Sequence, residues 1–285
     1  MRSVASEWPL VMFTVLAPLC AGIWMVAGFL ALIDAFPGAV DLTTGYAGAF
    51  LCVLLLATLA CSTLHLGKPL KALRAFMRLG NSSVSNEVFV GAVFALCSCL
   101  YVLVAQSLIE AGSLWKIPLA FVAGFAGLFV LFQCLAYRMR TVSTWNSPSF
   151  SVEFAVLALL GGVVVEGAML CLVPAVTAAV KMGLVVAEVA CALGLLLVVH
   201  AQGTAVACGV QGHRQGGQMM RTWHRLSFAR IAFLVTGSAL WAYGLLCVPS
   251  RPGWALVGGA LVVVGMVVGR YSFYRFYLNV GLPQG

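Results

Sequence analysis

Eight charge-poor apolar stretches divide this chain of 285 residues and limit what it can fold into. Each is close to the length of a helix that crosses about 30 Å of hydrocarbon. Backbone groups in lipid must be hydrogen-bonded within the protein, so only helices and closed barrels can span a bilayer. Leu, Ala, Val and Gly dominate without the period-two alternation of barrel strands, which predicts helices. The stretches are residues 10–33, 46–64, 88–109, 117–137, 154–173, 182–199, 231–248 and 253–269.

The composition agrees with a protein embedded in a lipid bilayer. Hydrophobic residues make up 62% of the sequence and charged residues only 8%, with a mean hydropathy of +1.06. A soluble domain needs more polar surface than this. The first apolar stretch is too long for a signal peptide and no polar cleavage region follows it. We therefore predict an all-α, polytopic bundle of eight transmembrane helices, with residues 1–285 forming one integral-membrane anchor domain.

The cations are distributed unevenly between the two sides of the predicted bundle. Eight helices place both termini on one side, which we call the basic end, together with the second, fourth and sixth loops. The positive-inside rule makes this end cytoplasmic, and a second interpretation is that it docks an anionic partner. Its loops are short and few aromatic residues lie between the cations, which argues against nucleic acid. The opposite end has Lys116, Lys181 and Arg251, and the basic end has Arg2, Lys68, Lys71, Arg74, Arg78, Arg138, Arg140, Arg214, Arg221, Arg225, Arg230, Arg270 and Arg275.

The cysteines and histidines give little support for a metal centre in this protein. Nine of the ten cysteines lie in or beside apolar stretches, Cys208 lies in the predicted sixth loop, and no C-x-x-C pair occurs. No spacing suits an iron–sulfur cluster or a zinc site. His65 and His200 are predicted to end helices near the basic end, which allows a haem ligand pair, whereas His213 and His224 are predicted to lie in a loop or at the interface. We expect no haem and no iron–sulfur cluster in this protein, and a b-type cytochrome subunit remains an alternative.

The segment between the second and third apolar stretches concentrates ionisable groups. His65 stands at its leading edge and Glu87 at its trailing edge. Such groups are costly near hydrocarbon and usually serve a function. A carboxylate can accept a proton from a ring hydroxyl, and an imidazole can bond a second ring oxygen. The segment therefore predicts a site for a small ligand with two oxygens, while the alternative for Glu87 is a carboxylate favoured by a helix N-terminus.

Short motifs along nearly the whole sequence carry a resemblance to a known family. The most specific frame is His-Leu-Gly at 65–67 followed by Ser-Asn-Glu at 85–87. Further matches lie at residues 7–15, 69 and 78–80, with weaker ones at 137–145 and 269–281. In these motifs the protein resembles the membrane-anchor subunit of the dimethyl sulfoxide reductase family, which belongs to the quinol-oxidising anchors of molybdenum enzymes.

The resemblance implies a respiratory complex in the cytoplasmic membrane. Such an anchor holds a molybdopterin catalytic subunit and an electron-transfer subunit with four iron–sulfur clusters, and itself carries no haem. It binds menaquinol near His65 and Glu87 and passes electrons to the nearest cluster. Glu87 is the expected proton acceptor, and Lys71 and Arg78 are expected to help bind the quinol. Lys71 stands where close relatives have Arg, so it keeps the charge but loses the bidentate fork.

Docking follows from the absence of a redox centre, because the quinol must then lie close to the partner's first cluster. We expect the iron–sulfur partner on the basic end, over residues 68–78 and 214–225.

Two further carboxyl groups lie deep in apolar stretches. Glu166 and Glu188 are expected roughly 10–16 Å below the surface opposite the basic end, at 1.5 Å per helical residue. One interpretation is protonated side chains bonded to backbone carbonyls or to each other. The other is a proton path, and a secondary transporter with these residues along its path is a further alternative function.

Overall fold

The computed structural model describes residues 8–64, 79–138, 142, 145–173, 176–211, 216–247 and 249–276. Within these ranges eight helices are long and apolar enough to cross a membrane, which confirms the predicted all-α, polytopic fold. Two short 3-10 turns, η2 (Ala39–Leu42) and η4 (Ser113–Trp115), precede α2 and α4. The helices are α1 (Trp8–Leu32), α2 (Gly45–Leu64), α3 (Ser83–Glu110), α4 (Lys116–Ala136), α5 (Pro148–Leu170), α6 (Ala178–Val210), α7 (Gly216–Leu246) and α8 (Pro252–Arg275).

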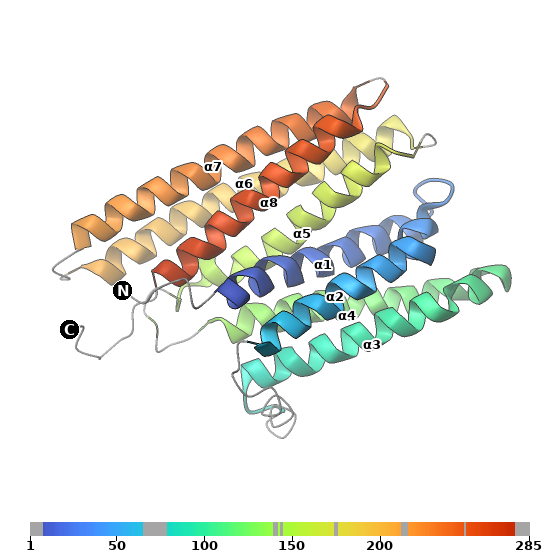
Figure 1. Cartoon of the computed structure of the whole chain (residues 1–285), viewed down its shortest axis with the longest axis horizontal. Coiled ribbons are helices and arrows are strands. Elements are labelled where there is room, and N and C mark those ends of the chain that lie inside the picture. The colour runs from blue at the N-terminus through green and yellow to red at the C-terminus, as the bar shows by residue number, and fades with distance from the viewer. Residues whose placement is uncertain are drawn as a thin grey trace.

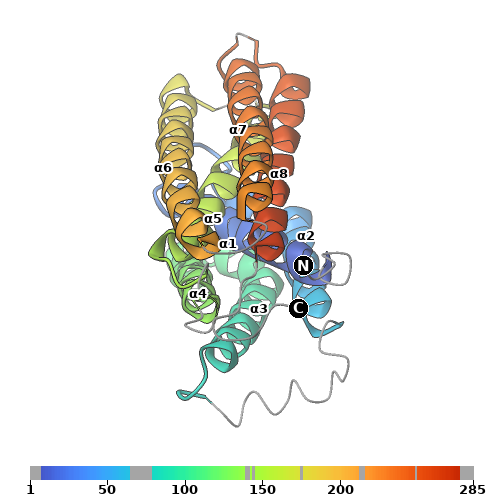
Figure 2. The ribbon, with the colours of Figure 1, turned by 90° about the vertical axis from the view of Figure 1, so that its left-hand side faces the viewer.

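The bundle has two sides that meet at a central pair of helices. α1 and α5 lie in the middle, with α2, α3 and α4 on one side and α6, α7 and α8 on the other (Figure 1). The view along the bundle shows the same division, with α1 and α5 between the two sets (Figure 2). α1 begins and α8 ends at the same end of the molecule, as eight spans require, and this is the basic end.

Glycines allow the central helices to approach closely. A Cβ atom on Gly22 of α1 would lie 1.7 Å from the carbonyl oxygen of Ala158 in α5, and one on Gly162 would lie 2.2 Å from the carbonyl oxygen of Gly22. α7 and α8 are similarly close, because a Cβ on Gly258 would lie 2.3 Å from the backbone nitrogen of Trp241. Small residues at such crossings let backbones touch in membrane bundles, where packing drives helix association.

Polar side chains mark where several helices begin. Ser82 caps α3, with its hydroxyl accepting from the Ser85 N–H at 3.4 Å. Ser147 caps α5 ahead of Pro148, and Thr177 caps α6. These residues satisfy backbone donors that have no partner in the first turn of a helix.

Two helices on the α6–α8 side are longer than their apolar stretches predicted. α6 runs to Val210 rather than ending at residue 199, and α7 begins at Gly216 rather than at 231. The predicted bounds of these two helices are therefore wrong, and residues 211–215 alone separate them. Fourteen residues of α7 precede Arg230, which corresponds to about 21 Å of helix axis.

Several ionisable residues consequently lie elsewhere than predicted. His200 lies inside α6 instead of ending it. Arg221 and Arg225 lie on the exposed first turns of α7, not in a loop. Arg230 and Arg270, predicted among the loop cations, are buried within α7 and α8. Lys68, Arg74, Arg140 and Arg214 fall outside the described residues.

Candidate functional site

A band of buried polar side chains crosses the bundle near the basic end. One part, which we call the α3–α4 pair, is Glu87 with Gln133. Glu87 is the fifth residue of α3, and Gln133 lies three residues before the end of α4. The other part joins four helices of the opposite side, and we call it the arginine cluster. Its members are Glu153 of α5, Gln202 of α6, Arg230 of α7 and Arg270 of α8.

The start of α3 explains how Glu87 comes to face inward. Gly80 adopts a left-handed conformation with φ of 80°, and its N–H donates to Oδ1 of Asn86 at 2.8 Å. With Ser82 capping the helix, this bond fixes the first turn of α3. Glu87 follows on the buried side, where only 5% of the residue is exposed. Asn86 of the Ser-Asn-Glu motif therefore stabilises the turn before α3, and Glu87 of the same motif is buried inside the bundle.

The carboxyl group of Glu87 is incompletely satisfied by the part of the protein that the structure describes. Its Oε1 has no hydrogen-bond partner there. The Gln133 amide lies beside it, but without hydrogen-bond geometry, and both polar atoms of that amide are also unpaired among the described residues. Buried polar groups are normally hydrogen-bonded. The α3–α4 pair thus offers an acceptor, a donor and a second acceptor to a ligand or to water.

The arginine cluster is held by short contacts to one carboxylate. Nη2 of Arg230 lies 2.5 Å from Oε1 of Glu153, and Nη2 of Arg270 lies 3.2 Å from Oε2. Nε2 of Gln202 donates to the same Oε2 at 2.8 Å, and Arg230 donates to the Gln202 carbonyl oxygen at 3.4 Å. None of the four residues is more than 3% exposed. A single carboxylate therefore links α5, α6, α7 and α8.

Aromatic rings enclose the second arginine of the cluster. The Arg270 guanidinium carbon lies 3.7 Å from the centroid of the Phe154 ring and 5.3 Å from that of Phe273. Such cation–π contacts stabilise a desolvated cation. Beyond its ion pair with Glu153, none of the Arg270 nitrogen donors makes a hydrogen bond to a described residue.

Two tyrosines lie near both Glu87 of the α3–α4 pair and Arg270 of the arginine cluster. The Tyr137 ring packs 5.1 Å from Phe154, and the Tyr274 ring 5.1 Å from Phe273. Their hydroxyl groups are neighbours, and both are close enough to Glu87 and Arg270 to interact electrostatically with these side chains. Although part of the Tyr137 side chain is exposed, burial of its hydroxyl raises its pKa well above the usual range. A raised pKa favours the protonated hydroxyl group, which is able to donate a hydrogen bond.

The remaining predicted site residues are only partly located. His65, Lys71 and Arg78 lie outside the described residues. Glu188 is 1% exposed and accepts a short hydrogen bond from the Ser238 hydroxyl of α7. Glu166 is 3% exposed, and its Oε2 has no hydrogen-bond partner in the described ranges. No hydrogen bond between Glu166 and Glu188 is found in the described ranges, so the two acids do not bond each other there. The proton path through them stays a prediction.

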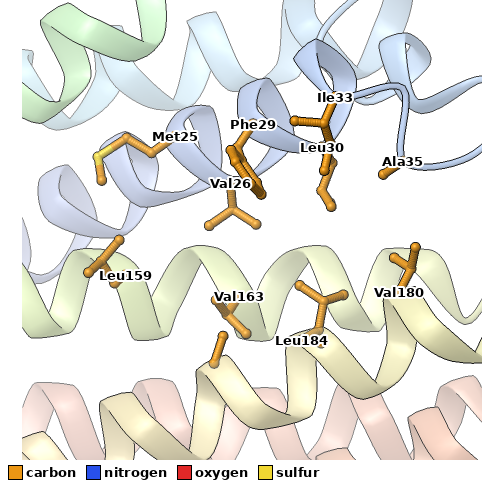
Figure 3. A pocket seen from close by; sticks show the side chains of 12 residues that line it. Met25, Val26, Phe29, Leu30, Ile33, Ala35, Leu159, Val163, Val180 and Leu184 are labelled. Atoms are coloured by element: carbon orange, nitrogen blue, oxygen red, sulfur yellow. The ribbon is translucent and has the colours of Figure 1, made fainter.

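An apolar groove near the other end of the bundle is a poor candidate for a polar ring. It has a volume of about 450 Å³, and its lining comes from α1 and the residues just after it, from α5 and from α6, including Met25, Leu159 and Leu184 (Figure 3). Phe29 and Ile33 on its rim are more than half exposed, so the groove opens toward lipid. Without a polar side chain in its lining, it suits hydrocarbon chains and leaves the buried polar band as the candidate site.

Comparison with known proteins identifies the family. A family model described as DMSO reductase anchor subunit (DmsC) matches residues 1–276. The chain belongs to the DMSO reductase anchor subunit family. This membership, with its eight apolar helices, makes it a multi-pass membrane anchor in a complex with catalytic partner subunits.

Relatives in two bacteria are similar over most or much of their length. The YnfH subunit of an anaerobic dimethyl sulfoxide reductase of Escherichia coli is 30% identical over 282 residues, which cover 97% of this anchor subunit and 96% of the relative. The C subunit of anaerobic dimethyl sulfoxide reductase in Escherichia coli is 28% identical over 280 residues, with the same coverage. The corresponding C subunit in Haemophilus influenzae is 32% identical over 168 residues, or 58% of each protein.

Proposed function

We propose that this anchor subunit oxidises menaquinol beside Glu87 and passes the electrons to an iron–sulfur partner subunit in the cytoplasmic membrane. That partner has four clusters and passes the electrons on to a molybdopterin catalytic subunit. The observation that carries the proposal is the buried Glu87 carboxyl group, whose Oε1 has no hydrogen-bond partner among the described residues. An unsatisfied carboxyl group at the membrane edge is suited to receive a proton from a bound quinol.

The neighbouring groups fit a ligand with two ring oxygens. Glu87 accepts the proton of one ring hydroxyl, so the O–H bond of the quinol breaks and an O–H bond on the carboxylate forms. The Gln133 amide, buried and unpaired in the described part of the protein, can hold a ring oxygen while this happens. His65 is the proposed partner of the second ring oxygen, with Lys71 and Arg78 nearby. The second hydroxyl gives its proton to the His65 imidazole, so the quinol loses two protons in all, and its two electrons leave for the partner subunit.

The partner is proposed to dock on the basic end. The α3–α4 pair lies within two turns of that end, so a partner seated there comes close to the quinol. α7 extends about 21 Å beyond the buried Arg230 and carries exposed Arg221 and Arg225. These cations suit a partner with an acidic surface.

Replacing Glu87 tests this function in the complete complex. Glu87→Gln removes the proton acceptor but keeps the shape, and it is expected to lower menaquinol-dependent reduction by at least about 100-fold, the usual contribution of a positioned general base. An artificial donor that reduces the catalytic subunits directly should give the unmutated rate, which reports intact assembly.

Glu110→Gln is the matched control, because Glu110 is an exposed carboxylate at the other end of the same helix. It is expected to leave both rates unchanged. Menaquinol oxidation by Glu87→Gln at the unmutated rate would place the site elsewhere.

A further inference from the structure

The apolar groove between α1 and α6 is a gap that the packing of the helices leaves open. α1 and α6 both pack against α5, but they make no close backbone contact with each other in the described ranges. Leu159 and Val163 of α5 form the floor of the groove, and the other two helices form its walls (Figure 3). Phe29 and Ile33 on the rim are more than half exposed, so the groove opens to the surrounding lipid.

The dimensions of the groove suit hydrocarbon chains and exclude a protein helix. Its lining runs from Met25 to Ile33, which is about 12 Å at 1.5 Å per helical residue and most of the roughly 15 Å depth of one leaflet. A volume of about 450 Å³ over that length gives a mean cross-section of about 40 Å². A helix about 10 Å across needs about 80 Å². A helix from a partner or from a second copy of this subunit therefore does not fit.

An ion pair lies at the mouth of the groove, at the end of the bundle opposite the basic end. Asp34 stands between Ile33 and Ala35, which both line the groove. Its carboxylate lies 2.6 Å from the ammonium of Lys116, so this pair adds no net charge to the mouth. The backbone of Asp34 is left-handed, with φ of 49°, and turns the chain away from α1 at this point.

Lys181 gives the mouth a net positive charge. It directly follows Val180 of the groove lining. Its ammonium donates to the Ser250 hydroxyl and forms no ion pair with a described acid. A hydroxyl does not neutralise the charge, and the ammonium has three donors, so donors remain for a ligand. The nearby Arg251 packs its guanidinium over the Tyr243 ring instead.

We propose that this groove binds an anionic phospholipid, with its acyl chains along Leu159 and Val163 and its phosphate beside Lys181. The lipid fills the gap between α1 and α6 and links these helices where they do not touch. The lining alone selects no particular lipid, because bulk lipid is equally apolar. The charge at the mouth selects the headgroup, since one cation near the membrane surface favours an anionic lipid about fivefold. The site lies at the opposite end of the bundle from Glu87 and does not depend on the proposed function.

Photoreactive lipids test this inference in the complete complex. The complex is placed in phosphatidylcholine nanodiscs that contain a small, equal fraction of phosphatidylglycerol or phosphatidylcholine with a diazirine on one acyl chain. Labelled peptides are identified by mass spectrometry. The phosphatidylglycerol probe is expected to label residues of the lining, such as Met25 and Leu184, about fivefold more than the phosphatidylcholine probe. Equal labelling by the two probes would overturn the inference, because the groove would then hold bulk lipid alone.

Variants at the mouth test the role of its charge. Lys181→Gln removes the net charge and should abolish the excess labelling by phosphatidylglycerol, whereas Lys181→Arg keeps the charge and should retain the excess. Asp34→Asn leaves Lys116 unpaired and should increase the excess about fivefold further. Asn tolerates the left-handed backbone of this position. An unchanged excess in Lys181→Gln, or a decrease in Asp34→Asn, would contradict the proposed headgroup site.

Gly183→Phe tests the groove itself. Gly183 belongs to the lining, and a Cβ there meets open space, so the Phe ring can fill the groove without displacing a helix. The excess labelling should disappear, while the catalytic partner subunits still co-purify. Gly194→Phe is the matched control, because Gly194 lies on the same helix with equally open space but outside the lining, and it should label normally.

Three results would refute the assignment of the groove to a phospholipid. The first is excess labelling in Gly183→Phe at the unmutated level. The second is loss of the labelling when menaquinone is added, which would assign the groove to a quinone tail. The third is cross-linking of the lining residues to another protein chain, which would make the groove a protein interface.

Discussion

Replacing Glu153 by Leu should destabilise the bundle severely. The substitution leaves Arg230 and Arg270 buried without the carboxylate that lies 2.5 and 3.2 Å from their nitrogens. Removing one partner of a buried ion pair typically costs about 3–5 kcal/mol. Gln202 also loses the acceptor of its 2.8 Å hydrogen bond, which by itself costs about 1–3 kcal/mol. Because these groups share one carboxylate, the losses are not additive, and we expect a total of at least about 3 kcal/mol.

The cost should arise from stranded charge rather than from a lost attraction. The triple variant Glu153→Leu/Arg230→Met/Arg270→Met removes every charge of the cluster while keeping apolar volume. Replacing a whole buried ionic group by hydrophobic residues is often neutral or stabilising. The triple variant should therefore be more stable than Glu153→Leu alone, despite carrying two more substitutions.

Unfolding of the detergent-purified complex by a denaturing detergent, followed by tryptophan fluorescence, measures these differences. The control is Glu110→Leu, since Glu110 is exposed and accepts one hydrogen bond, from Gln106. It should change the free energy of unfolding by no more than about 0.5 kcal/mol. The reasoning is refuted if Glu153→Leu behaves like this control, or if the triple variant is less stable than Glu153→Leu.

Two further predictions concern packing and docking. Gly22→Ala should prevent accumulation of folded protein, because its Cβ would lie 1.7 Å from a backbone oxygen of α5, whereas Gly124→Ala, with open space around it, should accumulate normally in the same membrane fractions. In a Cys208→Ser background, bound partner subunits should protect Asn81→Cys at the basic end from an impermeant thiol reagent but not Tyr46→Cys, which replaces a 98% exposed side chain at the start of α2. Protection of the Tyr46 variant instead would contradict docking at the basic end, and labelling in whole cells would show which compartment that end faces.

Hydropathy predicted the number and order of the helices, because crossing a bilayer depends mainly on composition and length. It misplaced helix ends at the residues that form the arginine cluster. The predicted fifth helix began directly after Glu153, the seventh directly after Arg230, and the eighth ended directly before Arg270. A charge beside an apolar stretch can mark the membrane edge or can be paired inside the bundle. The sequence alone cannot distinguish a charge at the membrane edge from one paired inside the bundle, since Glu153 and Arg230 are 77 residues apart and meet only in the fold.

The candidate site was predictable only in part for a related reason. Glu87 could be singled out because it follows a cap signal and belongs to a specific motif, and the structure accounts for Asn86 and Glu87 in that motif. Gln133 could not be singled out in this way, because a lone amide inside an apolar stretch often has a purely structural role. Its meaning comes from α4 packing against α3, which places the amide beside Glu87. Contacts between helices, which no local pattern specifies, therefore define the rest of the site.

The two sides of the bundle have different polar groups near the basic end. The α3–α4 pair supplies the groups that would touch the ring, and the arginine cluster joins α5, α6, α7 and α8 through the carboxylate of Glu153. Tyr137 and Tyr274 lie where the two sides meet. α7 carries both the buried Arg230 and the exposed cations proposed to face the partner, so the helix proposed to meet the partner is held inside the bundle by the Glu153 carboxylate.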